Sequence, residues 1–239
     1  GPKATSILFD KIVNFTDANC DQEHPSIIIL DNTKIPDRTN YILTKQGKSP
    51  FDDIGEALDI FSSVIKPQGT VGMACNTAHY FAKLIDKKAK LYGFSFINMP
   101  EYALKYIALS NLNKSCCVLC TQGTKAAKIY NQANHDGLEI LYPSDEQCEE
   151  MQSIIYQIKD TSNVDYIKIA LKLADLMEKI GDYTFILACT ELSILDKSLF
   201  GQVSIVDAMD ILSMMLVNKS GHRIKMVDSR YDEKIIRMM

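Results

Sequence analysis

Short apolar runs alternate with longer segments of helical periodicity along this chain, and this alternation constrains its fold more than any other feature. The pattern is typical of βα units built around parallel strands. It predicts an α/β protein whose parallel-rich sheets are flanked by helices. We expect strands at Ser26–Leu30, Thr70–Ala74, Leu91–Ile97, Ser115–Cys120, Leu138–Leu141, Tyr183–Ala188 and Val203–Val206. We expect helices at Pro2–Phe15, Phe51–Ile65, Thr77–Lys87, Pro100–Leu112, Lys125–Asn134, Gln147–Lys159, Asp165–Ile180 and Ala208–Val217.

One pattern occurs twice, about half a chain length apart. Residues 57–79 and residues 173–192 each read as a helix, a turn with glycine and a buried strand that ends in Ala-Cys, at Cys75 and Cys189. A capping residue follows each cysteine, Asn76 or Thr190. Ligands of open α/β sheets bind at the carboxyl ends of strands. We therefore predict two pseudo-symmetric lobes, residues 1–98 with about 208–239 and residues 99–207, and an active site in the cleft between them.

Composition narrows the class of protein and its compartment. Of the 239 residues, 46% are hydrophobic and 23% charged, which is an ordinary globular profile. The net charge of -4 argues against a nucleic-acid or anionic-membrane partner, because such partners are held by clustered Lys and Arg. Seven cysteines, with Cys116 and Cys117 adjacent, favour free thiols in a reducing, cytoplasmic setting. Neither a basic-apolar leader nor a run of 18 apolar residues is visible.

The two repeated cysteines can carry chemistry. A thiol at a helix N-terminus meets unpaired N–H groups and the positive end of the helix dipole, so we expect lowered pKa values at Cys75 and Cys189. Inverting a carbon stereocentre requires a base on one face of the carbon and an acid on the other. Two thiols on opposite walls of a cleft suit that task. The alternative is that each cysteine is only a small buried hydrophobe at the end of a strand.

Other cysteine chemistries fit less well. Cys117 and Cys120 form a C-x-x-C sequence, but inside a strand their side chains point to opposite faces, so we predict no metal or redox site there. A phosphatase-like arginine is absent from the places that Phe81 and Leu195 occupy. His79 stands four residues after Cys75, which leaves a Cys–His hydrolase pair open as an alternative to a packing role.

The strings around these residues resemble the aspartate/glutamate racemase superfamily, and within it the aspartate racemase branch. The first catalytic motif of that family is similar to residues 74–79, and the second to residues 188–191. Residues 21–25 and the Ile-Pro-Asp-Arg-Thr string at 35–39 suggest the aspartate branch, as does Glu191, where glutamate racemases carry a His. The likeness continues through residues 119–124 and 206–210.

This resemblance implies racemisation without pyridoxal phosphate, metal or any other cofactor. It gives Cys75 and Cys189 the roles of the two acid/bases, and Arg38 the role of holding the side-chain carboxylate, for which its planar fork is well shaped. A surface ion pair with Asp37 is the alternative for Arg38. Lys159 would assist at the same end, although the glycine usual just after it is missing. The α-carboxylate would be held by hydroxyl, amide and backbone donors at Asn76, Thr77, Thr121, Thr124 and Thr190.

The function that we expect is conversion of L-aspartate to D-aspartate by two-base proton transfer. Alternatives are a racemase for glutamate or another short amino acid, a single-cysteine lyase or isomerase acting on a small diacid, and a catalytically silent amino-acid-binding protein. The family commonly pairs through its first lobe, so we expect a homodimer. Family members also open with a strand and a Gly-Gly-x-Gly-Pro turn, whereas this sequence begins at Gly-Pro, so we expect the natural protein to contain that strand.

Overall fold

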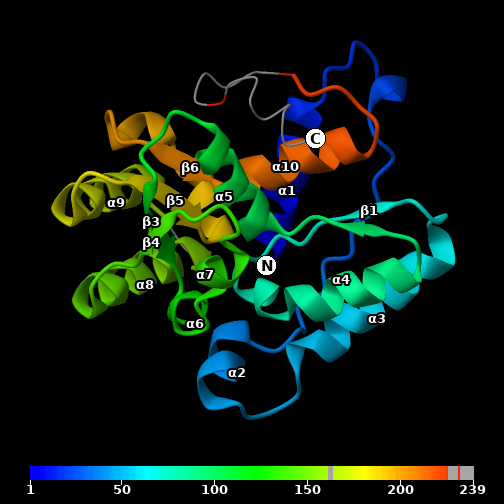
Figure 1. The fold of residues 1–239 in the computed structure, drawn as a ribbon, viewed down its shortest axis with the longest axis horizontal. Helices are drawn as coiled ribbons and strands as arrows, with labels where there is room; N and C mark the ends of the chain where they lie inside the picture. The colour runs from blue at the N-terminus through cyan, green and yellow to red at the C-terminus, as the bar shows by residue number, and fades with distance from the viewer. Residues whose placement is uncertain (161–163, 226–230, 232–239) are drawn as a thin grey trace.

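The computed structural model describes residues 1–160, 164–225 and 231, which form two parallel sheets surrounded by helices (Figure 1). The larger sheet has the order β4-β3-β5-β6, with β4 at Glu139–Leu141, β3 at Ser115–Cys120, β5 at Thr184–Ala188 and β6 at Ile205–Asp207. All of its neighbouring strands are parallel, in a register that pairs Cys116 with Thr184 and Cys120 with Ala188. The predicted α/β class and parallel pairing are confirmed.

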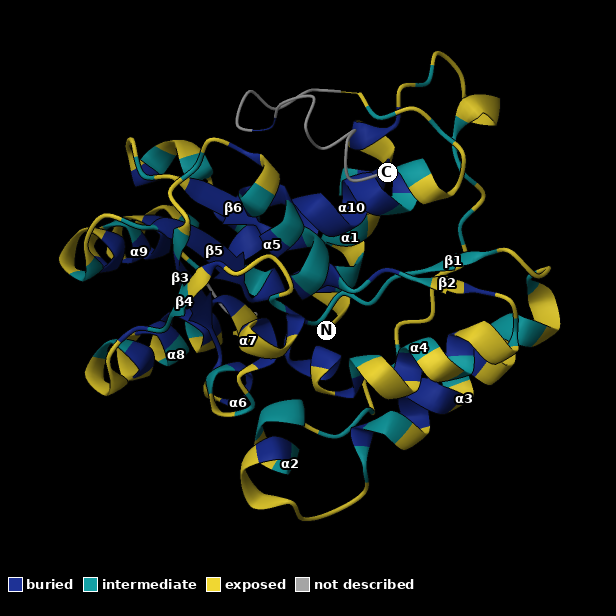
Figure 2. Ribbon diagram, viewed as in Figure 1, coloured by how far each residue is buried: buried dark blue, intermediate teal, exposed yellow. Residues whose placement is uncertain are grey.

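Both faces of the larger sheet are covered by helices, which explains why its strands read as continuous apolar runs. Helices α8 (Asp145–Lys159) and α9 (Tyr166–Ile180) pack on one face, and α1 (Pro2–Phe15), α5 (Met99–Leu109) and α10 (Ala208–Lys219) on the other (Figure 2). Alternate strand residues point to opposite faces. Cys117 therefore lies in the core beneath α8 and α9, whereas Cys120 lies in the core beneath α5 and α10.

The smaller sheet consists of two short parallel strands, β1 (Thr70–Val71) and β2 (Ser95–Phe96). Helices α3 (Pro50–Val64) and α4 (Ala82–Leu91) pack against it. The prediction of a strand at Ser26–Leu30 is wrong, because no described strand pairs with this segment and most of its apolar side chains are exposed. The predicted strand at Leu91–Ile97 begins late, since Gly93 has a φ of +71° and turns the chain after α4.

Several helices differ from their predicted form. The segment predicted as one helix at Lys125–Asn134 is divided into α6 (Gln122–Ala126) and α7 (Ile129–Ala133), because Lys128 between them is left-handed with a φ of 49°. The segment predicted at Thr77–Lys87 begins as a 3₁₀ turn, η2 (Thr77–Phe81), before α4. Helix α2 (Arg38–Thr44) has no counterpart among the predicted helices, and the Asp37 side chain caps it by accepting from the Asn40 N–H.

The remaining helices agree with prediction within a few residues, and their ends have local causes. Helix α8 begins at a capping box in which the side chains of Ser144 and Gln147 accept from each other's backbone N–H groups. Asp165 and Asp207 cap α9 and α10 in the same side-chain-to-backbone manner. Three further 3₁₀ turns complete the described elements, η1 (Asp21–Glu23), η3 (Thr190–Ile194) and η4 (Lys197–Phe200).

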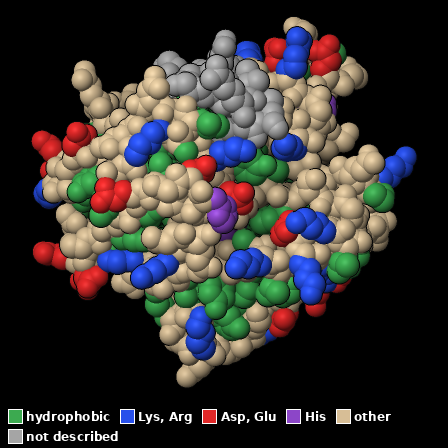
Figure 3. Space-filling view, viewed as in Figure 1, with side chains coloured by type: hydrophobic (Ala, Val, Ile, Leu, Met, Phe, Trp, Pro, Cys, Tyr) green, Lys and Arg blue, Asp and Glu red, His purple; other side chains and the backbone are tan. Residues whose placement is uncertain are grey.

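The surface and the helix lengths bear on the expected partners. Lys, Arg, Asp and Glu side chains are interspersed on the face in Figure 3, without a broad stripe of one sign. In the part of the chain that the structure describes, every helix is too short or too polar to cross a membrane. The end of the segment 208–239 assigned to the first lobe lies outside the described residues, apart from Tyr231, and the division into lobes stays a prediction.

Candidate active site

Cys75 and Cys189 follow β1 and β5, and both line one small pocket where the two sheets approach each other. Thr190 Oγ1 lies 3.4 Å from the Ala74 carbonyl oxygen, so the two Ala-Cys motifs are in direct contact. Every predicted site residue except Thr124 lines this pocket. The lining residues from the prediction are Arg38, Cys75, Asn76, Thr77, Thr121, Lys159, Cys189 and Thr190.

The two sulfurs lie in unlike surroundings. Cys75 is partly exposed, whereas Cys189 is buried at 5% exposure. The expectation of a lowered pKa at Cys189 is wrong: burial first, and the neighbouring Glu191 carboxylate second, raise its pKa well above the ordinary value. The physical reason is that Cys189 precedes only η3, a short 3₁₀ turn, which contributes too little dipole to offset burial beside an anion.

Arg38 lies on the Cys75 side of the pocket, in the first turn of α2. Its Nη1 donates to the carbonyls of Ile35 and Pro36, each at 3.2 Å, which fixes the guanidinium with respect to the backbone. Burial acts to lower the Arg38 pKa, but the Cys75 sulfur together with the carboxylates of Asp37 and Glu191 outweighs burial and raises it. Arg38 is thus placed to stabilise a thiolate at Cys75 and to hold a carboxylate in the pocket.

Glu191 is a pocket residue that the sequence marks only as a feature of one branch of the family. Its Oε2 accepts from the Cys189 thiol at 3.0 Å and from the Thr190 hydroxyl at 3.3 Å. Its Oε1 lies 3.8 Å from Lys159 Nζ, at the end of α8. Burial alone would raise the Glu191 pKa, but Lys159, the hydrogen bond from the Cys189 thiol and a backbone hydrogen bond together outweigh burial and lower the pKa, so the carboxylate stays charged. Lys159 and Glu191 therefore form an ion pair beside Cys189.

Three threonine hydroxyls form a closed cluster behind Cys75. Thr77 Oγ1 lies 2.9 Å from Thr121 Oγ1 and 3.0 Å from Thr124 Oγ1, and the latter two are 3.2 Å apart. Thr124 is fully buried and supports the other two hydroxyls without lining the pocket. Thr121 also caps α6 by accepting from the Thr124 N–H. The cluster joins α6 to η2 and presents hydroxyls to the pocket.

Asn76 brings an unused hydrogen-bond donor to the pocket. Its Oδ1 accepts from the Tyr130 hydroxyl at 2.7 Å, while its Nδ2 is buried and has no partner among the described residues. A buried amide without a partner costs about 1–3 kcal/mol, which a ligand acceptor would recover. Tyr130, fully buried on α7, fixes the orientation of the amide, because Oδ1 accepts from its hydroxyl and Nδ2 is left as the free donor. The position suits one oxygen of a bound carboxylate.

His79 does not form a pair with the Cys75 thiol. Its Nδ1 bonds to the Cys75 carbonyl at 2.8 Å, and its Nε2 accepts from the Met99 N–H at 3.2 Å. Because the ring is buried, its pKa falls from 6.5 to about 4. The imidazole is therefore neutral and structural, and the Cys–His alternative fails since both ring nitrogens are occupied by the backbone.

A buried ionic network anchors the segment that carries Cys189. Ser193, on η3, donates to Asp207 Oδ1 at 2.7 Å, and Lys197 Nζ lies 2.8 Å from Asp207 Oδ2. Lys11, on α1, pairs with Asp210 and lies 3.9 Å from Asp207. Burial opposes ionisation of Asp207, but Lys197 and Lys11 outweigh it and lower its pKa. The network ties η3 to α1 and α10.

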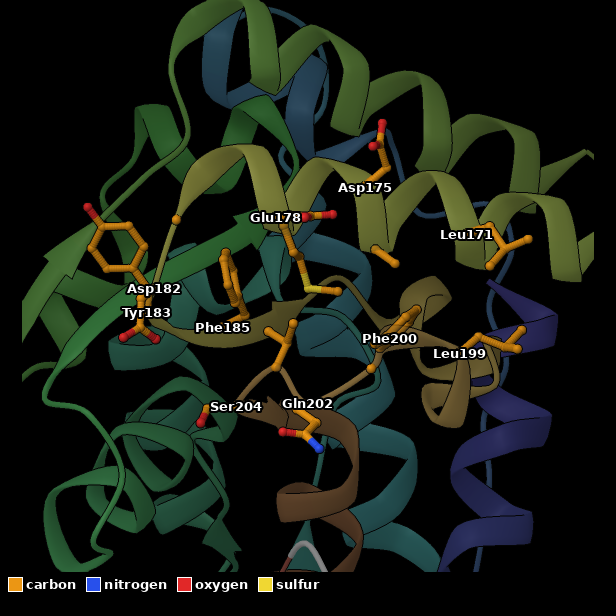
Figure 4. Close-up of a pocket in the computed structure, with 15 residues that line it drawn as sticks. Leu171, Asp175, Glu178, Asp182, Tyr183, Phe185, Leu199, Phe200, Gln202 and Ser204 are labelled. Atoms are coloured by element: carbon orange, nitrogen blue, oxygen red, sulfur yellow. The ribbon is translucent and has the colours of Figure 1, made fainter.

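A larger, open groove lies at the opposite, amino-terminal end of β5 and β6 (Figure 4). It is bordered by α9 and η4, and Phe185 and Phe200 contribute its apolar part. The groove is also lined by three acidic residues, Asp175, Glu178 and Asp182. The described residues that line it include no Cys, Lys or Arg. It therefore lacks the cations and thiols that the smaller pocket brings together.

The fold defines a two-sheet parallel α/β enzyme scaffold with paired cysteines at strand ends. The sequence profile of the family described as Asp/Glu/Hydantoin racemase matches residues 1–216, and the chain belongs to this family, whose members include amino-acid racemases. Membership identifies the chain as an enzyme of the amino-acid racemase class.

Solved structures share this fold at low sequence identity. The aspartate racemase of Picrophilus torridus matches with a TM-score of 0.80 and 23% identity, covering 99% of this chain and 94% of its own. An aspartate racemase homologue from Pyrococcus horikoshii OT3 matches with a TM-score of 0.70 and 19% identity, over 92% of this chain and 95% of its own. A glutamate racemase isoform from Bacillus anthracis matches with a TM-score of 0.61 and 17% identity, over 90% and 77%.

Proposed function

We propose that this chain interconverts the two enantiomers of aspartate by two-base proton transfer between Cys75 and Cys189, without a cofactor. The observation that carries the proposal is that both thiols line one pocket together with two cations, Arg38 and Lys159. A dicarboxylic amino acid needs cationic or donor groups for two carboxylates and a proton-transfer group on each face of Cα. These residue types are all present at the pocket.

The acid/base roles follow from the two environments. Cys75 beside the Arg38 guanidinium is suited to act as the thiolate that removes the α-proton, because an adjacent cation favours the charged form. Cys189, buried and hydrogen-bonded to Glu191, is suited to act as the thiol that donates a proton to the other face. After the transfer Cys75 holds a proton and Cys189 is the thiolate. The opposite enantiomer therefore reacts by the reverse step, in which Cys189 removes the α-proton and Cys75 donates one.

Negative charge that builds at the α-carboxylate must be stabilised by fixed donors, since the proposed mechanism uses no imine. The free Nδ2 of Asn76 is available for that purpose, and the hydroxyls of Thr77, Thr121 and Thr190 line the same pocket. Arg38 and Lys159 would hold the side-chain carboxylate. Two of the similar structures are named as an aspartate racemase or a homologue of one, which supports aspartate over glutamate. Glu191, in place of the His of glutamate racemases, supports the same choice.

Chiral chromatography of L-aspartate and of D-aspartate, each incubated with the purified protein in deuterated water, tests the proposal. Starting from either enantiomer, the reaction should give a mixture of L-aspartate and D-aspartate that carries deuterium at Cα. The substitutions Cys75→Ser and Cys189→Ser should each abolish interconversion, while Cys20→Ser, which alters an exposed cysteine outside the pocket, should not.

The same measurement separates the alternatives. Racemisation of glutamate in preference to aspartate would make glutamate the assigned substrate. A product with a changed carbon skeleton would indicate a lyase. Binding of aspartate without deuterium incorporation would indicate a binding protein. If either serine variant of the two pocket cysteines kept near-normal activity, the two-base assignment would be lost.

A further inference from the structure

Glu191 is the one carboxylate that touches a proposed acid/base sulfur through a hydrogen bond among the described residues. The Cys189 Sγ donates to its Oε2 at 3.0 Å, and the Thr190 hydroxyl donates to the same oxygen at 3.3 Å. The other oxygen faces Lys159 at 3.8 Å. A carboxylate held from both sides in this way cannot rotate freely away from the thiol.

We propose that Glu191 is a positioning residue that keeps the resting proton on Cys189, so that Cys75 is the sulfur that begins catalysis as the base. This inference rests on the proposed function. An ionised carboxylate accepts a hydrogen bond from a thiol but repels a thiolate. The Cys75 side of the pocket has the opposite character, since Cys75 lines the pocket together with the Arg38 guanidinium, a cation. The two sulfurs therefore differ in which form their neighbours stabilise.

The charges around Cys189 come from several elements. Lys159 on α8 opposes Glu191, while Tyr130 on α7 is neutral because burial raises its pKa well above the ordinary value. Cys75 and Arg38 act on Lys159. Among these groups only Glu191 contacts the Cys189 sulfur by a hydrogen bond in the described part of the chain. Removing the Glu191 carboxylate should therefore affect the Cys189 thiol before any other group of the pocket.

The kinetic consequence is an asymmetry between the enantiomers. Because the Glu191 carboxylate disfavours a Cys189 thiolate, the enzyme form in which Cys189 keeps its proton dominates. The enantiomer that needs the other form therefore finds only a small fraction of the enzyme ready to react with it. Its apparent affinity is reduced by that fraction. Since enantiomers have equal free energy, kcat/KM must be the same in both directions, and the difference appears as unequal KM values offset by unequal kcat values.

The substitution Glu191→Gln keeps the size of the side chain and removes its charge. The pH profile of kcat/KM for aspartate should keep its acidic limb, and its basic limb should move to lower pH by about one unit or more. The KM values of the two enantiomers should also become more similar. Glu191→Asp, which restores the charge, should return the basic limb toward the wild-type position. Glu178→Gln, an exposed position on α9, should change neither limb.

A second readout does not depend on activity. In a Cys75→Ser background, the pH dependence of Cys189 alkylation by iodoacetamide is followed by peptide mass spectrometry. Adding Glu191→Gln should lower the pH of half-maximal reaction, whereas adding Lys159→Gln should raise it, because that change removes the cation that favours the thiolate. A structural role for Glu191 would not produce opposite shifts.

The two proposals fail in distinguishable ways. If aspartate and glutamate show no Cα exchange with the wild-type protein, the proposed function fails, while the alkylation profiles still decide the role of Glu191. If the basic limb and the Cys189 alkylation profile are both unchanged in the Glu191→Gln proteins, the inference about Glu191 is overturned. If Glu191→Gln fails to fold, the alkylation profile of Lys159→Gln decides, and an absent or downward shift refutes the inference.

Discussion

Protonation of His79 should cost this protein about 2 kcal/mol of stability between pH 7.5 and pH 5. The buried ring has a pKa of about 4, against 6.5 when exposed. The unfolded chain therefore binds a proton at this position as the pH falls through 6.5, whereas the folded protein does not until near pH 4. The folded-state pKa of a base is depressed here, so stability is present above 6.5 and is lost as the pH falls through this window. Applying proton linkage to the two values gives about 2 kcal/mol at pH 5.

The assay is urea denaturation of the wild-type protein and His79→Gln at several pH values from 7.5 to 5. Glutamine can both donate to the Cys75 carbonyl and accept from the Met99 N–H, and it does not titrate. The wild-type protein should lose about 2 kcal/mol more than the variant across this range. Carboxylates with shifted pKa values, such as Asp210, are present in both proteins, so their contributions to the pH dependence of stability cancel in the difference. Parallel stability curves, within about 0.5 kcal/mol, would refute a buried neutral imidazole.

Three further predictions concern the pocket and the assembly. Tyr130→Phe removes the hydroxyl that orients Asn76, so KM for aspartate should rise about three- to tenfold with a smaller change in kcat; an unchanged KM in steady-state kinetics would exclude the orienting role. Gly123→Ala places a Cβ 2.8 Å from Thr39 Cα, so α2 must shift and carry Arg38 with it. The free energy of unfolding should fall by about 1–3 kcal/mol in denaturation experiments, and KM for aspartate should rise. A wild-type stability together with a wild-type KM would contradict this close approach. Sedimentation velocity should show twice the monomer mass, as expected of a homodimer, and a single monomer peak at micromolar concentration would exclude a stable one.

The larger sheet could be predicted from sequence because its information is local and periodic. The apolar runs at β3 and β5 are buried on both faces, so each reads as an unbroken hydrophobic stretch. The repeated Ala-Cys brought Cys75 and Cys189 to one pocket as expected, although the strand predicted at Thr70–Ala74 ends at Val71, four residues before Cys75. The nine predicted site residues do gather around one pocket, with Thr124 behind it.

What escaped prediction depends on tertiary contacts. Helix α2 is short and lies against α6, so its stability comes from packing and the Asp37 cap more than from an apolar period. A left-handed Lys128 divides α6 from α7, and lysine carries no sequence signal for that conformation. Glu191 matters because Lys159 and Cys189 meet it in space. Its position next to a Cys-Thr pair was visible in the sequence, but its ion pair was not.

The segment Ser26–Leu30 has a consequence for handling this protein in solution. Ile28, Ile29 and Leu30 are each 39–49% exposed, in a segment outside the described helices and strands whose backbone makes no hydrogen bond among the described residues. Such a stretch has both the β-propensity and the free backbone groups that allow strands of separate molecules to pair. The protein in concentrated samples should therefore self-associate through the segment Ser26–Leu30. A lysine in place of Ile29 is the simplest change to oppose that association.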